Sequence, residues 1–79
     1  MILPATCRAG RALVGLTQAQ LAAAASVGLS TIKNFEAGSY EPIANNRRAI
    51  QSALEAAGVE FIEDGAIPSP GGAGVRLRA

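Results

Sequence analysis

Apolar residues recur at helical spacing in four short segments within residues 1–58. Leu21 and Ala25 stand four positions apart, and Ile32 and Phe35 stand three apart. The last segment has an apolar stripe at Ile50, Ala53, Leu54 and Ala57. Residues three or four positions apart lie on the same face of an α-helix. The pattern therefore predicts helices over residues 4–14, 18–25, 29–36 and 47–57.

The ends of these predicted helices carry residues that favour helix starts or stops. Pro4 suits a first helical turn, where its missing N–H is not needed. Thr17 and Gln20 form a capping-box pattern, in which each side chain bonds the other residue's backbone N–H. Asn46 is expected to cap the fourth helix. The C-terminal ends are expected at three glycines, which accept a left-handed backbone: Gly15, Gly38 and Gly58.

The hydrophobic period changes after Gly58. Residues 59–63 and 75–78 alternate between apolar and polar side chains, as a half-buried strand does. The glycine- and proline-rich residues 64–74 between them are expected to form a loop. We therefore predict a C-terminal β-hairpin, which divides the chain into a helical part, 1–58, and a hairpin extension, 59–79. A single hairpin is only marginally stable alone, so its apolar face needs cover.

Residues 17–38 have the spacing of a helix-turn-helix. Two helices joined by a short turn can pack nearly at right angles, which leaves the second one projecting. In DNA-binding proteins of this kind, the second helix enters the major groove. The segment resembles the lambda-repressor-like, Cro/Xre helix-turn-helix family, and the resemblance covers residues 4–62. The matching residues are Thr17, Gln18, Leu21, Ala22, Val27, Ser30, Thr31, Ile32, Phe35, Glu36, Ala37 and Gly38.

The resemblance implies a mainly helical domain that binds double-stranded DNA as a sequence-specific transcriptional regulator, with helix 29–36 in the major groove. It implies that Gln18 binds phosphate and braces the reading helix, and that Leu29, Ser30 and Asn34 face the bases. Asn34 suits adenine, whose N6 and N7 a carboxamide can bind together. Leu29 can only touch a thymine methyl or pack against sugar. The remaining DNA contacts, to phosphates, fall on Thr31, Lys33 and Tyr40.

Two positions depart from the family pattern. Gly28 stands where a Ser or Thr usually caps the reading helix, and Ser26 stands where the turn usually has a glycine. Because the turn has no glycine at this position, we expect that none of its residues adopts a positive φ. The resemblance also implies a partly buried ion pair between Arg11 and Glu36, which joins the first helix to the third.

The net charge of the chain is only +1, but it is unevenly distributed. Residues 1–54 hold five basic and two acidic side chains, a balance of +3, whereas residues 55–79 hold two basic and four acidic ones, a balance of −2. The helical part is thus the more basic, as phosphate binding requires. Arg47 and Arg48 are interpreted either as phosphate contacts or as solvated side chains.

Composition excludes several classes of function. The chain has no histidine and one cysteine, so a His/Cys metal site, an internal disulfide and a histidine-activated nucleophile are excluded. Cys7 is interpreted as a small core residue. We expect no enzyme, no cofactor and no metal. The N-terminal residues lack the pattern of a secretory signal, and no apolar run can cross a bilayer, so we expect a cytoplasmic protein without membrane contact.

The small size of the chain favours a partner subunit. A domain of 79 residues buries only about 60% of its unfolded surface. We expect a homodimer that binds two half-sites about one helical turn apart. Its interface is expected on four apolar hairpin residues, Val59, Phe61, Val75 and Leu77. The alternative function is a protein-interaction module, an antitoxin or adaptor with weak DNA binding, which the low net charge and the apolar Leu29 favour.

Overall fold

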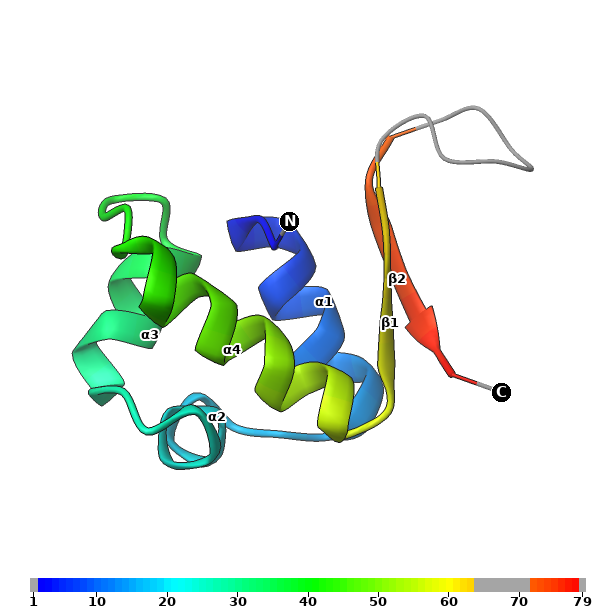
Figure 1. Ribbon diagram of the computed structural model, residues 1–79, viewed down its shortest axis with the longest axis horizontal. Coiled ribbons are helices and arrows are strands. Elements are labelled where there is room, and N and C mark those ends of the chain that lie inside the picture. The colour runs from blue at the N-terminus through cyan, green and yellow to red at the C-terminus, as the bar shows by residue number, and fades with distance from the viewer. Residues whose placement is uncertain (1, 64–71, 79) are drawn as a thin grey trace.

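Four helices precede a two-stranded antiparallel sheet in the computed structural model, which describes residues 2–63 and 72–78 (Figure 1). The helices are α1 (Pro4–Val14), α2 (Gln18–Ala25), α3 (Leu29–Glu36) and α4 (Ala44–Ala56). The strands are β1 (Val59–Ile62) and β2 (Gly74–Leu77). The predicted fold class, mainly helical with a C-terminal hairpin, is confirmed.

The first three helices begin and end at the residues expected from the sequence. At the start of α2, the hydroxyl of Thr17 accepts a hydrogen bond from the Gln20 backbone N–H at 3.0 Å. The Gln20 carboxamide oxygen accepts one from the Thr17 N–H at 2.9 Å, which completes the capping box. Local side-chain chemistry therefore accounts for the start of this helix.

The start of α4 differs from the expectation. The helix begins at Ala44, three residues before the expected position 47, and Asn46 lies inside its first turn and does not cap it. Ile43 occupies the cap position with an extended backbone, and its carbonyl accepts the Arg47 N–H at 3.1 Å. The physical reason is tertiary, because the Arg47 guanidinium donates to the Ile2 carbonyl at 2.8 Å and to the Glu41 carboxylate. These contacts anchor the turn formed by residues 44–47, so the helix includes that turn and does not begin after Asn46.

The turn between α2 and α3 also departs from the expectation. Ser26 itself adopts the left-handed conformation, with φ 58° and ψ 42°, so the turn does contain a residue at positive φ. A non-glycine residue in this region costs about 1–2 kcal/mol. Two hydrogen bonds offset the cost, from Ser26 N–H to Ala23 at 3.2 Å and from Val27 N–H to Ala22 at 3.0 Å.

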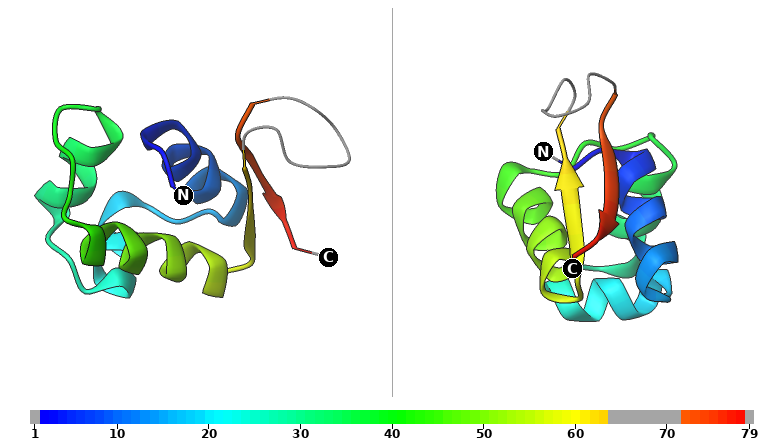
Figure 2. Two further views of the ribbon diagram at one scale, coloured as in Figure 1. Left: turned by 45° about the horizontal axis from the view of Figure 1, so that its top comes forward. Right: turned by 90° about the vertical axis from the view of Figure 1, so that its right-hand side faces the viewer.

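The hairpin pairs β1 with β2 so that Val59 lies opposite Leu77 and Phe61 lies opposite Val75. These four side chains share one face of the sheet. Val59 belongs to the core, Phe61 and Val75 pack partly against it, and both strands lie beside α1 (Figure 2). Val59 is therefore only 1% exposed, within the core of its own chain, and the expectation that it contacts a second subunit is wrong.

The boundaries of the hairpin shift slightly from those expected. β1 ends at Ile62, one residue before the expected end, and β2 runs from Gly74, inside the expected loop, to Leu77. Residues 64–71 of that expected loop lie outside the described residues.

The core is formed by one buried cluster to which every helix and β1 contribute. Its members are Ile2, Cys7, Leu21, Ala22, Ala25, Ile32, Phe35, Ile50, Leu54 and Val59. At Gly10, α1 lies directly beside this cluster, because a Cβ there would meet Leu54 Cδ1 at 3.4 Å and Val59 Cγ1 at 3.5 Å, which are ordinary van der Waals distances. The hairpin is thus packed onto the same core that positions the helix-turn-helix.

Candidate nucleic-acid interface

The reading helix α3 has a buried face and an exposed face. Ile32 and Phe35 are buried against the other helices. The residues that reach solvent are Leu29, Ser30, Lys33 and Asn34. Three of the four are polar, and α3 therefore presents a mixed surface of hydrogen-bonding groups, one cation and one aliphatic side chain.

The other residues expected at the DNA lie beside this face. Thr31 is half-buried in the first turn of α3, next to Gly28. Gln18 is half-buried at the start of α2, and Tyr40, 47% exposed, follows α3 in the loop before α4. The structure thus places the expected residues on α3 itself, on the start of α2 and on the loop after α3.

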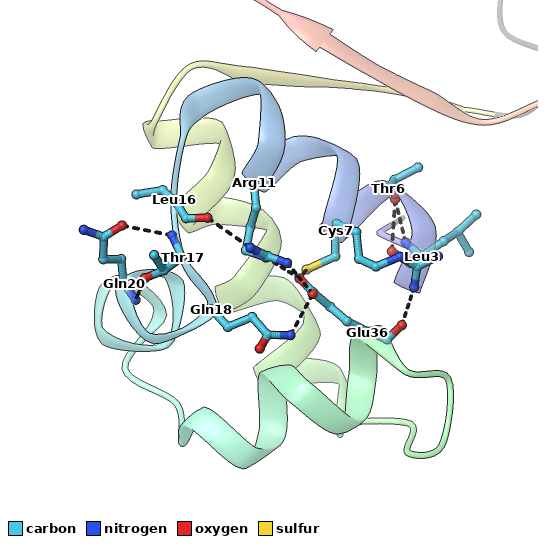
Figure 3. Close-up of polar contacts among 10 residues, drawn as sticks. Leu3, Thr6, Cys7, Arg11, Leu16, Thr17, Gln18, Gln20 and Glu36 are labelled. Carbon is cyan, nitrogen blue, oxygen red and sulfur yellow. Dashed lines mark hydrogen bonds and ion pairs between the residues drawn. The ribbon is translucent and has the colours of Figure 1, made fainter.

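A buried carboxylate at the end of α3 joins three elements (Figure 3). Glu36 is 3% exposed, and its two oxygens accept hydrogen bonds from Arg11 Nε and Nη2, each at 2.7 Å. Gln18 Nε2 donates to Oε1 at 3.0 Å, and the Cys7 thiol donates to Oε2 at 3.1 Å. We call these four residues the Glu36 cluster. It connects α1, the start of α2 and the end of the reading helix.

The hydrogen bonds in the Glu36 cluster determine its ionisation. Burial by itself raises the pKa of Glu36, but the bonds from its three donors outweigh burial, so the pKa lies below its ordinary value of 4.5. The bond to Glu36 raises the pKa of Arg11. Burial first, and then the neighbouring carboxylate, raise the pKa of the Cys7 thiol, which therefore stays protonated and donates. The cluster is a buried ion pair with two neutral donors.

Two further arginine contacts fix the position of α1. Arg11 Nη1 donates to the Leu16 carbonyl at 3.0 Å, which holds the link between α1 and α2. Arg8 donates to the backbone carbonyl of Glu36, one of the free carbonyls at the end of α3. Cationic groups at a helix C-terminus are favourable because the helix dipole is negative there. The Arg8 contact therefore joins α1 to the end of α3, and the Arg11 contact joins α1 to the segment before α2.

The Arg11–Glu36 pair was expected from the sequence, and so was a bracing role for Gln18, but the partners of Gln18 and Cys7 were not. The Gln18–Glu36 and Cys7–Glu36 bonds join residues 18 and 29 positions apart, and no spacing pattern indicates them. Arg47, which we interpreted as a phosphate contact or a solvated side chain, is mostly buried and is engaged within the chain. It bonds Ile2 and Glu41, and its guanidinium lies 5.9 Å from the Phe35 ring centroid. Arg48, by contrast, is exposed.

The family of the chain follows from its sequence. The helix-turn-helix family model HTH_3 matches residues 8–54, which is more than half of the chain. The matched region contains α2, α3 and both partners of the Arg11–Glu36 ion pair. The chain therefore belongs to this DNA-binding helix-turn-helix family, of the Cro/Xre type. No curated protein was found to match the chain.

Other kinds of site receive no support from the part of the chain that the structure describes. Across residues 2–63 and 72–78, no three His, Cys, Asp or Glu side chains gather as a metal site requires. Within the same residues, no helix has the length and apolar character needed to cross a membrane.

Proposed function

We propose that this protein is a transcriptional regulator that binds double-stranded DNA sequence-specifically, with α3 in the major groove. The exposed face of α3 carries the proposal, because Ser30 and Asn34 reach solvent from a helix whose far end the Glu36 cluster holds rigidly. A helix fits the major groove, where each base pair displays its own pattern of donors and acceptors. The Asn34 carboxamide can accept from adenine N6 and donate to N7.

Four side chains around this face are proposed to bind phosphates: Gln18, Thr31, Lys33 and Tyr40. A carboxamide nitrogen carries two N–H groups. One N–H of Gln18 is engaged by Glu36, so the second is the group that we assign to a phosphate oxygen. Gln18 is hydrogen-bonded to Glu36, the last residue of α3. A phosphate contact at Gln18 would therefore set the depth of α3 in the groove.

A second copy of the chain is part of this proposal, because one such module spans too little groove for a long binding site. The hairpin extension, 59–79, remains the proposed contact between copies. Val59 is buried, and Phe61 and Val75 pack partly against the core, so Leu77, which is 55% exposed, is the residue we assign to that contact. We place the protein in the cytoplasm, where its DNA would be.

Selection of bound duplexes from a random pool tests the proposal directly. We expect recovery of an inverted repeat, and no enrichment would refute sequence-specific binding. On the selected site, Asn34→Ala should relax preference at one base pair by about 1–3 kcal/mol. Asn45→Ala is the matched control, because Asn45 is an exposed asparagine on α4 and its removal should leave every base preference unchanged.

The rival function is a protein-interaction module with weak DNA binding. The single cation on α3, Lys33, and the exposed aliphatic Leu29 favour it. Salt titration separates the two functions, because log K for a DNA binder falls linearly with log salt in proportion to the phosphates contacted. A slope near zero on the tightest duplex would favour the protein-interaction module.

A further inference from the structure

Leu29 is a large aliphatic side chain at the first residue of the reading helix. It is 40% exposed, although Ile32, one turn later, is completely buried. Its neighbours on the exposed face are the polar side chains of Ser30 and Lys33. An aliphatic group in this position cannot form a hydrogen bond with a base edge, so its contribution to recognition must come from apolar contact.

The major groove offers one apolar group for such a contact. Thymine projects its C5 methyl there, whereas the other bases display hydrogen-bond donors and acceptors. Covering those polar groups with a leucine is unfavourable, because they lose their hydrogen bonds to water and gain none. Cytosine has the same ring position without the methyl, and 5-methylcytosine has it with the methyl. A leucine at the groove floor can therefore distinguish bases by the presence of this one group.

We propose that Leu29 selects a pyrimidine C5 methyl group, so that thymine or 5-methylcytosine is favoured over cytosine at the base pair it faces. This inference rests on the proposed function, since it requires α3 to lie in the major groove. Together with an adenine contact at Asn34, it predicts that an unmethylated half-site contains A·T pairs at the positions that Leu29 and Asn34 face.

Deoxyuridine substitution tests the inference, because uracil differs from thymine only in lacking the C5 methyl. In the selected duplex, each thymine is replaced in turn and the dissociation constant is measured. We expect one position per half-site at which the wild-type protein loses about fourfold in affinity, the effect of removing one buried methyl group. Replacing that thymine with cytosine should weaken binding, and 5-methylcytosine should bind more tightly than cytosine.

The Leu29→Ala variant shows whether Leu29 is the reader. Alanine favours helix, so the fold should persist, and circular dichroism verifies it. At the sensitive position, the wild-type protein should bind the thymine duplex about 4 times more tightly than the uracil duplex. In the variant, the two duplexes should bind equally. Leu13→Ala is the matched control, because Leu13 is 42% exposed on α1 and loses the same atoms, and it should keep the wild-type ratio.

The outcomes separate this inference from the proposed function. A selected duplex that tolerates uracil at every position overturns methyl reading alone and leaves DNA binding in place. A uracil effect that persists in Leu29→Ala assigns the methyl to another residue and also overturns the inference. If no duplex is enriched from the pool, the proposed function fails and methyl reading fails with it.

Discussion

Replacing Arg11 with methionine removes the cationic partner of a buried carboxylate. The substitution deletes two hydrogen bonds of 2.7 Å to Glu36 and the 3.0 Å bond to the Leu16 carbonyl. Glu36, 3% exposed, is then left charged with two neutral donors, Cys7 and Gln18. Methionine keeps most of the aliphatic stem of arginine, so the lost packing is small compared with the uncompensated charge.

The size of the effect follows from the burial of this pair. Removing one partner of a buried ion pair costs about 3–5 kcal/mol. At about 0.05–0.15 kcal/mol per residue, a domain of 79 residues has a total stability of about 4–12 kcal/mol. We therefore expect Arg11→Met to remove between a quarter and all of the free energy of unfolding.

Urea unfolding at neutral pH, followed by circular dichroism, measures this loss. The slope should be about 1–1.5 kcal/mol per M for so small a domain, so the midpoint should fall by about 2 M or more. Arg76→Met is the matched control. Its partner Glu60 also lies at 2.7 Å, but the two side chains are 63% and 41% exposed, and the midpoint should not change measurably.

Two outcomes would refute the reasoning. One is an Arg11→Met midpoint as close to wild type as that of Arg76→Met, which would mean that the Glu36 cluster does not hold the fold together. The other concerns the double variant Arg11→Met/Glu36→Leu, which removes the stranded charge. It should be more stable than Arg11→Met, and a less stable double variant would show that the charge is not the cause.

Three further predictions concern stability. The pKa of Glu36 is lower in the folded chain than its ordinary value of 4.5, so on acidification the unfolded chain binds the proton first. The free energy of unfolding should therefore be constant above about pH 5 and should fall as the pH drops below it. In Glu36→Gln this acid-induced fall should be shallower, and an equal fall would contradict the assignment. Ser26→Gly should raise the free energy of unfolding by about 1 kcal/mol, because glycine accepts the φ of 58° without strain, and a lower midpoint would contradict this. Gly10→Ala should also raise the free energy of unfolding, by about 1 kcal/mol, because alanine has the higher helix propensity. The added methyl meets Leu54 and Val59 at ordinary contact distances, and a destabilised variant would show that it pushes α1 away from them.

The first three helices could be predicted residue by residue. Thr17 and Gln20 specify the start of α2, and Gly15 and Gly38 follow α1 and α3 with φ values of 72° and 76°. These signals act over three or four neighbouring residues, so they do not depend on contacts between distant segments. The bounds of α1, α2 and α3, the hairpin and the helix-turn-helix family were therefore accessible from the sequence.

Local signals were insufficient where a tertiary contact competes with them. Asn46 is a favourable cap by residue type, but the bond from Arg47 to the Ile2 carbonyl anchors a first turn that begins at Ala44. Asn46 therefore lies inside α4. Ser26 disfavours a left-handed backbone, yet the packing of α3 against α2 requires one there. In both cases contacts between distant segments outweigh a local preference of about 1 kcal/mol.

The amino-acid sequence by itself determined the elements, their order and the polar face of α3, because each depends on residues that are close neighbours in the chain. Only the tertiary structure decided that Cys7 and Gln18 join the expected Arg11–Glu36 pair by donating to the same carboxylate. It likewise decided that Val59 belongs to the core of its own chain, where an interface residue had been the expectation. The physical reason is that burial depends on which segments pack together, and apolar character alone does not specify which side chains that packing leaves exposed.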